Sequence, residues 1–414
     1  MSEPDPSRTT PPGTPRDPEA EVPGTPDAPP STPGPAPRGG WRRARRSPLW
    51  LEIVVCIAVL LVAAAAVADH VDLNDYVLTP GVAQPVAPLV KVPKARAHRV
   101  RGDVFLTDVY ISQVTALSYL YDEVRGDAQV LPAATVLGPA TPASQLVAQG
   151  YLEMEQSQSA AKSAALTRLG YRVDVRDSGV AVFAVVSGSP ASKALAVGEV
   201  VRAVDGRSTP GVCAFAQALG SRRAGTTVQL TVERSHLNAH AELVPGPVLR
   251  KTVRLTRWPS SVPHPTATAA CPGSGWRGQG FLGVEVETQQ TFRFPFRITL
   301  RTTSIGGPSA GLAMTLGIID TLSGGDLTGG KKIAATGTIA PTGGVGEVGG
   351  IPEKTVAVER AGAAVFFVPA GQVKTAESKA TPSLRVYGVR SLAQVLTDLR
   401  RLGGTVPPAA RRGS

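Results

Sequence analysis

Apolar and polar positions divide the chain into segments with different patterns. In residues 1–47 large apolar side chains are almost absent, while Pro, Ser, Thr and Gly are common, which predicts a disordered segment. Residues 48–69 then form one apolar run whose only charged members are Glu52 near its start and Asp69 at its end. A helix of about twenty such residues is long enough to cross the hydrocarbon core of a bilayer. This run therefore predicts a transmembrane helix.

The charges beside this run predict its direction. Four arginines lie within positions 42–46, directly before it, and basic flanks remain on the cytoplasmic side of a membrane. We therefore expect a single-pass cell-membrane protein with a cytoplasmic N-terminus and all residues after His70 outside the cytoplasm. A cleaved signal peptide is the alternative, because Ala66-Val67-Ala68 resembles a cleavage site. The long polar region before the run favours an uncleaved anchor.

Beyond the anchor the pattern changes three times. Residues 70–169 mix a strand pattern at Val104–Ile111 with helical spacing, and we interpret them as a mixed α/β spacer. Residues 170–258 hold short apolar runs separated by turn signals, which is typical of a small β domain. Residues 259–280 are rich in Pro, Ser, Thr, Ala and Gly and are interpreted as a linker.

The last folded segment, residues 281–402, alternates strand and helix patterns, which predicts a layered α/β or α+β core. Residues 403–414 are basic at their end and predict a disordered tail. The expected fold is a multidomain α/β and β protein with one N-terminal transmembrane helix.

Composition restricts the function. The chain has 414 residues and a formal net charge of +11, but aromatic residues make up only 5% and do not alternate with basic ones. No platform for nucleic acid is therefore expected. Cys213 and Cys271 lie beyond the anchor without a CxxC pair, which argues against structural zinc. A disulfide between them fits an extracytoplasmic location, but the sequence does not show whether they meet.

Two glycine-rich segments resemble nucleotide sites without fitting them. Gly325–Lys332 mimics a phosphate-binding loop, but Lys332 stands where the magnesium-binding Ser or Thr is required. Gly344–Gly349 spells G-x-G-x-x-G without the βαβ unit and later acidic residue of a dinucleotide site. We expect no cofactor and no metal.

The strongest chemical signal is a glycine turn, Ile305–Gly311, that opens an apolar helix. It places the hydroxyl of Ser309 at a helix N-terminus, where backbone N–H groups and the helix dipole favour negative charge. Such a hydroxyl can serve as a nucleophile whose attack creates an oxyanion. An ordinary capping serine is the alternative. No histidine follows His264, so a Ser-His-Asp triad within residues 281–402 is excluded.

A neutral lysine can replace histidine as the base if it is buried. Lys354 follows Gly349-Gly350-Ile351-Pro352-Glu353, and Pro352 suits the first turn of a helix. On that helix Lys354 shares the apolar face with Val358 and Ala361. The alternative is a lysine that extends its amine to solvent.

The β domain at 170–258 resembles a PDZ domain over nearly ninety residues. The resemblance rests on a strand, a G-S-P-A turn, a G-x-x-V-x-A-V-D-G segment, a helix and a further strand. It implies that an extended peptide adds to a sheet edge. The residues implied for this role are Ser178, Gly179, Val180, Ala181 and Val182, with the carboxylate-binding loop around Asp177. A β domain that only separates its neighbours is the alternative.

The segment 281–402 resembles the proteolytic domain of Lon-type proteases, which are serine peptidases with a Ser-Lys dyad. The resemblance rests on Pro308-Ser309-Ala310-Gly311, Ala335–Ile339 and Gly349–Lys354, in the family's order. It implies that Ser309 is the nucleophile and Lys354 the general base, that Thr336 hydrogen-bonds the lysine, and that the N–H groups of Ser309 and Ala310 hold the oxyanion. Thr338 stands where many members have Glu, and no Walker pair precedes the domain.

Together these features are similar to membrane-anchored bacterial PDZ–Lon-like proteins. The resemblance implies an ATP-independent serine endopeptidase that hydrolyses extracytoplasmic proteins or peptides captured by its PDZ domain, and it makes a homo-oligomer plausible. The second hypothesis is a catalytically inactive PDZ adaptor on a Lon-like scaffold.

Overall fold

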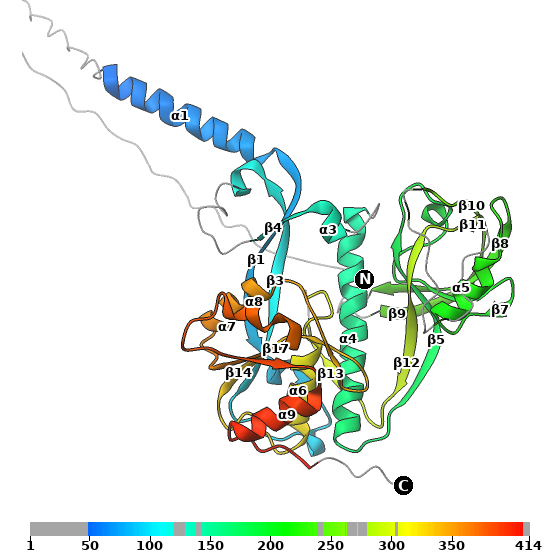
Figure 1. Cartoon of the computed structure of the whole chain (residues 1–414). Coiled ribbons are helices and arrows are strands. Elements are labelled where there is room, and N and C mark those ends of the chain that lie inside the picture. The colour runs from blue at the N-terminus through cyan, green and yellow to red at the C-terminus, as the bar shows by residue number, and fades with distance from the viewer. Residues whose placement is uncertain are drawn as a thin grey trace, which may run out of the picture. The chain divides into compact units, whose positions relative to one another are not determined.

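The computed structural model covers the whole chain (Figure 1) and describes residues 49–119, 129–137, 142–237, 243–260, 262, 271, 280–302 and 305–408. The chain divides into two compact units, Met1–Val59 and Leu60–Ser414. The predicted disordered segment 1–47 lies outside the described residues, as does the tail from residue 409.

Helix α1 (Leu49–Asp69) coincides with the predicted transmembrane run. None of its 21 residues is buried. At about 1.5 Å per residue it is about 30 Å long, which matches the hydrocarbon core of a bilayer. Among the described residues it is the one helix that is long and apolar enough to cross a membrane.

Two sheets in the second unit have six strands each, and the first, here called the mixed sheet, has the order β18-β17-β14-β3-β1-β4. The strands β3, β14, β17 and β18 run parallel, while β1 pairs antiparallel with β3 and β4. Their bounds are β1 Asp72–Pro85, β3 Asp103–Thr115, β4 Gln129–Pro132, β14 Lys332–Ala335, β17 Val365–Pro369 and β18 Arg385–Val389. All five residues of β17 are buried, as expected for a parallel strand covered on both faces.

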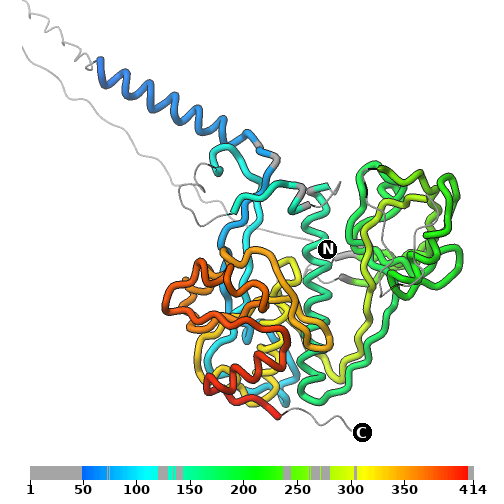
Figure 2. Tube along the Cα trace, viewed as in Figure 1, coloured from blue at the N-terminus to red at the C-terminus, as the bar shows by residue number. Residues whose placement is uncertain are grey.

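The interpretation of residues 70–169 as a spacer is wrong. Half of the mixed sheet comes from this segment, since β3 pairs directly with β14, for example Val104 with Ile333. Figure 2 shows the cyan trace of β1 and β3 running among the yellow to red trace of the C-terminal segment. The sequence could not show this, because more than 200 residues separate the paired strands and strand pairing leaves no local signal.

Helices cover both faces of this sheet. On one face α4 (Leu146–Arg168), α6 (Gly311–Leu322) and α9 (Leu392–Arg401) share a core with alternate strand residues such as Leu106 and Phe367. On the other face α7 (Ile351–Arg360) and α8 (Val373–Glu377) pack on Phe105 and Phe366. This is the layered α/β core that the sequence predicts, with a sheet completed by an earlier segment.

The second main sheet has strand order β12-β5-β6-β8-β9, with β7 beside β6, and helix α5 (Val212–Gly220) in its core. Its strands are β5 Asp174–Val185, β6 Val200–Val204, β7 Arg207–Ser208, β8 Thr227–Leu237, β9 Leu243–Arg254 and β12 Val284–Arg293. The sequence analysis assigned the start of β12 to the C-terminal domain. The structure instead pairs it with β5 along its whole length, from Val284–Val185 to Arg293–Asp174. The small β domain is therefore inserted in the chain between β4 and β14 of the mixed sheet.

The other described elements are short. The strand pairs are β2 with β13, β10 with β11 and β15 with β16. Their bounds, with those of the remaining helix and 3₁₀ turns, are β2 Val90–Lys91, β10 Thr256–Arg257, β11 Gly280–Phe281, β13 Thr299–Leu300, β15 Thr338–Ile339, β16 Val345–Gly346, α3 Ala133–Leu137, η1 Ala87–Leu89, η2 Lys94–Arg96, η3 Ala143–Gln145, η4 Pro190–Lys193 and η5 Ala370–Gln372.

Candidate active site

The turn before α6 is fixed by close packing against α4. Gly307 has a left-handed backbone (φ +85°), and its N–H donates to the carbonyl of Gly150 at 2.7 Å. A Cβ on Gly306 would lie 3.2 Å from backbone atoms of Gly150, so a larger residue there would push the turn and α4 apart by a few tenths of an ångström. The hydroxyl of Ser157 in α4 donates to the carbonyl of Pro308 at 2.9 Å. Helix α4 therefore sets the position of the turn that carries Ser309.

A second contact holds the backbone of Ser309 itself. Its carbonyl accepts the N–H of Gly337 at 2.9 Å and the hydroxyl of Thr336 at 3.3 Å. The predicted hydrogen bond from Thr336 to Lys354 is not present among the described residues, so that prediction is corrected: the Thr336 hydroxyl bonds the turn that carries Ser309. Neither the N–H of Ser309 nor that of Ala310 donates a hydrogen bond within the described part of the chain.

Lys354 is buried, and the solvent-exposed alternative is wrong. Its side chain is 2% exposed. Burial lowers the pKa of the Lys354 amine to about 8, although the nearby Asp108 and Glu353 raise it. Gly350 lets α7 begin directly over β3, since a Cβ there would lie 2.8 Å from a methyl carbon of Val109. The predicted apolar face is present, because Val358 is fully buried.

Ser309 and Lys354 line one cavity of about 410 Å³. In the described residues no hydrogen bond joins the serine hydroxyl to the amine, and such bonds are often long before substrate binds. Asp108 of β3 and Glu153 of α4 line the same cavity. The sequence analysis missed both, because they belong to the segment that was interpreted as a spacer.

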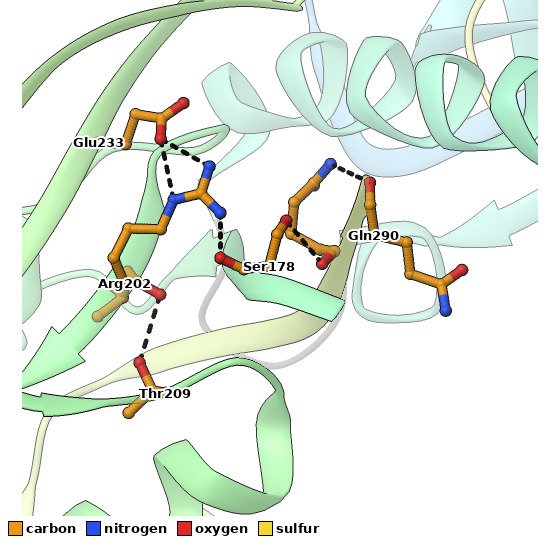
Figure 3. A network of polar contacts seen from close by, with 7 residues as sticks. Ser178, Arg202, Thr209, Glu233 and Gln290 are labelled. Atoms are coloured by element: carbon orange, nitrogen blue, oxygen red, sulfur yellow. Dashed lines mark hydrogen bonds and ion pairs between the residues drawn. The ribbon is translucent and has the colours of Figure 1, made fainter. Parts of the chain in front are cut away.

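The residues predicted to bind peptide lie in the middle of a sheet. Ser178–Val182 belong to β5, which pairs with β6 on one side and with β12 on the other. The Arg202 guanidinium donates to the Glu233 carboxylate and to the backbone carbonyl of Ser178 (Figure 3). The Ser178 hydroxyl in turn donates to the backbone carbonyl of Gln289 in β12 at 3.1 Å. In the same network Gln290 donates to Asp177 at 3.2 Å. The backbone of this segment has no free edge for peptide, which corrects the predicted edge.

One edge strand of this sheet is β12, and β9 is the other. Among the described strands, none pairs with the other side of β12. Helix α5 lies beside it, and the N–H of Val212 donates to the hydroxyl of Thr288 at 3.2 Å. Gly283, directly before β12, has φ +83°, and a Cβ there would lie 2.1 Å from Ser189. In the sequence, the only sign of this strand was the segment Gly280–Gly283 followed by alternating apolar and polar residues.

The two cysteines after α1, whose pairing the sequence left open, are bonded to each other. Cys213 in the first turn of α5 forms a disulfide with Cys271, with their Cα atoms 5.3 Å apart. Cys56 is free and exposed on α1. No cluster of three or more potential metal ligands occurs in the described ranges.

Comparison with known proteins identifies two domains. The family model of the PDZ domain matches residues 167–244, and that of the Lon protease (S16) C-terminal proteolytic domain matches residues 297–399. Among curated proteins, none matches the chain.

Two solved structures are similar to part of the chain. The PDZ domain of an SdrC-like protein from Listeria monocytogenes is 16% identical and covers 26% of this chain and 87% of its own, with a TM-score of 0.18. The corresponding domain from Listeria innocua is 19% identical and covers 27% and 96%, with a TM-score of 0.19. TM-scores this low do not support a structural relationship, so the two domains are assigned from the family models alone. The chain therefore contains a PDZ domain and a Lon-type C-terminal proteolytic domain, preceded by one helix that is long and apolar enough to anchor it in a membrane.

Proposed function

We propose that the protein is a membrane-anchored, ATP-independent serine endopeptidase with Ser309 as nucleophile and Lys354 as general base. The observation that carries this proposal is the buried Lys354 amine, with a pKa lowered to about 8, in the same cavity as Ser309. An amine with this pKa is neutral in about half of the molecules at pH 8 and can accept a proton.

In the proposed reaction neutral Lys354 takes the proton of the Ser309 hydroxyl as the oxygen attacks a peptide carbonyl. The oxyanion that forms accepts hydrogen bonds from the N–H groups of Ser309 and Ala310. The Lys354 ammonium then donates its proton to the leaving amine. Water attacks the acyl-enzyme, Lys354 accepts a proton from it, and Ser309 regains its hydroxyl.

Peptide capture is proposed for the outer edge of β12. Main-chain hydrogen bonds along an open edge provide affinity for an extended peptide. Helix α5 forms a wall along this edge near Thr288. This proposal replaces the edge predicted from sequence, Ser178–Val182 of β5, because the backbone of β5 is already hydrogen-bonded to β6 and β12.

The location and energy source are part of the proposal. Arginines within positions 42–46 favour a cytoplasmic N-terminus and an extracytoplasmic catalytic domain. ATP independence is supported by Gly325–Lys332, which lacks the hydroxyl residue needed for magnesium.

A fluorophosphonate probe tests the nucleophile directly. We expect covalent labelling of the wild type, and none in Ser309→Ala or Lys354→Met. Ser323→Ala is the matched control, because Ser323 directly follows the last residue of α6, and it should label normally. Labelling that persists in Ser309→Ala contradicts the assignment.

The adaptor hypothesis remains the second candidate, because Ser309 and Lys354 are not hydrogen-bonded to each other in the described structure. It predicts no labelling of the wild type and intact peptide binding. Labelling by the fluorophosphonate probe separates the two candidates, and isothermal titration with free-acid peptides checks that the protein used still binds peptide.

A further inference from the structure

We infer, on the basis of the proposed endopeptidase function, that the Glu153 carboxylate selects substrates with an arginine or lysine side chain beside the scissile bond. Glu153 would thus determine which peptides Ser309 and Lys354 cut. Three features support this role: the position of Glu153 next to the nucleophile, the lack of a partner for its carboxylate among the described residues, and the charges and apolar groups around it.

Glu153 lies beside the turn that carries the nucleophile. It is on α4 between Gly150 and Ser157, the two residues whose hydrogen bonds hold that turn. A Cβ built on Gly307, two positions before Ser309, would lie 3.9 Å from the Oε2 atom of Glu153. Glu153 and Ser309 also line the same cavity. A peptide that reaches Ser309 therefore lies next to the Glu153 carboxylate.

The Glu153 carboxylate has no partner in the part of the chain that the structure describes. It accepts no hydrogen bond and forms no ion pair there, although its side chain is partly buried. Burial and the charges of Glu287 and Glu285 raise the pKa of Glu153 to about 7. A partly buried carboxylate that faces like charges is destabilised until a cation pairs with it. A bound substrate can supply that cation.

The cleft around Glu153 is acidic, in contrast to the chain as a whole. Three carboxylates and one amine line the Ser309 cavity, and they belong to Asp108, Glu153, Glu347 and Lys354. A second cavity of about 380 Å³ shares Glu153 with the first and adds Glu155 and Glu287, and no described lysine or arginine lines it. The whole chain has a net charge of +11. The local negative charge attracts cationic segments of a substrate and repels acidic ones.

The walls of the Ser309 cavity suit the stem of a long basic side chain. Ile111, Ile305 and Val348 line this cavity together with Glu153. Arginine and lysine carry their charge at the end of an aliphatic stem, so the stem can contact these apolar groups while the tip pairs with the carboxylate. A leucine side chain would contact the same walls but leave Glu153 unpaired, and a glutamate would add a further negative charge.

The test uses full-length protein in detergent micelles and N-acetylated neutral peptides that contain a single arginine. In the matched peptide citrulline replaces the arginine, which keeps the shape of the side chain and removes its charge. We expect kcat/KM to be about ten- to a hundredfold higher for the arginine peptide. Because an extended peptide advances about 3.4 Å per residue, the cut should lie within about two residues of the arginine. Shifting the arginine along the peptide should shift the cut with it.

Two variants assign this preference to Glu153. Glu153→Gln keeps the shape of the side chain and removes its charge, so the ratio of kcat/KM for arginine over citrulline should fall close to one. Glu153→Arg should instead favour a peptide with glutamate at the same position. Glu377→Gln is the matched control, because Glu377 is an exposed residue of α8 that lines neither cavity. Its ratio should equal that of the wild type.

Several results overturn the preference and leave the endopeptidase in place. Equal rates for the arginine and citrulline peptides do so, as does faster cleavage of a peptide with leucine at that position. An arginine peptide that stays uncut although the fluorophosphonate probe labels Ser309 has the same meaning. A ratio that Glu153→Gln leaves unchanged removes Glu153 from this role. If no peptide is cut and the probe does not label Ser309, the proposed function and the preference fail together.

Discussion

Replacing the buried lysine with methionine should make the protein more stable while abolishing its activity. Lys354 is 2% exposed, and its ammonium form is disfavoured by burial. Methionine is also unbranched, is of similar length and carries no charge. Lys354→Met therefore removes the cost of a buried charge with little change in packing.

The size of the effect follows from the pKa. The ordinary value of 10.5 falls to about 8 in the folded protein. At 1.36 kcal/mol per pKa unit the difference amounts to about 3 kcal/mol. Because the folded pKa is the lower one, the unfolded chain binds more protons between about pH 8 and 10.5, and stability rises with pH there. Below pH 8 the full cost is present, so the variant gains up to about 3 kcal/mol at pH 7.

The assay is thermal unfolding of the purified protein at pH 7 and again near pH 10.5. We expect the variant to melt on the order of 5 °C above the wild type at pH 7. The difference should shrink towards zero at the higher pH. Lys374→Met is the control, because it removes the same charge from an exposed lysine and should leave the unfolding temperature nearly unchanged.

One result refutes this reasoning. If Lys354→Met is less stable than the wild type at pH 7, the ammonium is held by favourable contacts and is not a desolvated base. The Ser-Lys mechanism would then lose its main physical support.

Three further predictions concern the pH profile and the fold. First, kcat/KM should fall below about pH 8, with about a tenfold loss per pH unit. Asp108→Asn should move this acid limb to lower pH, because Asp108 raises the pKa of Lys354. A shift to higher pH contradicts this. Second, Gly317→Val should lower the free energy of unfolding by about 1–3 kcal/mol, since a Cβ at Gly317 would lie 2.4 Å from a methyl carbon of Val86. Gly349→Ala is the control: a Cβ there would have no atom within 4 Å, so this variant should unfold in urea like the wild type. Replacing both Cys213 and Cys271 by serine opens a loop of 58 residues and should lower the free energy of unfolding by about 4 kcal/mol; an unchanged urea midpoint contradicts this.

The sequence alone determined the parts of the molecule whose signals are local. The apolar run of α1 and the alternation of the PDZ strands appear within single windows of sequence. The two family models match the regions of the PDZ strands and of the Ser309 and Lys354 motifs. The glycine turn around Ser309 and the helix start before Lys354 are also local, because turn and cap residues act on their immediate neighbours.

Only the tertiary structure decided which distant segments belong together. The sheet behind the active site takes β1 and β3 from residues that the sequence presents as a spacer. One edge strand of the sheet that contains the PDZ strands is β12, which lies about 100 residues after β5 in the chain but directly beside it in the sheet. Backbone pairing is nearly independent of side-chain identity, so the pattern of one strand does not name its partner. The burial that lowers the pKa of Lys354 arises in the same way, from elements that meet only after the chain has folded.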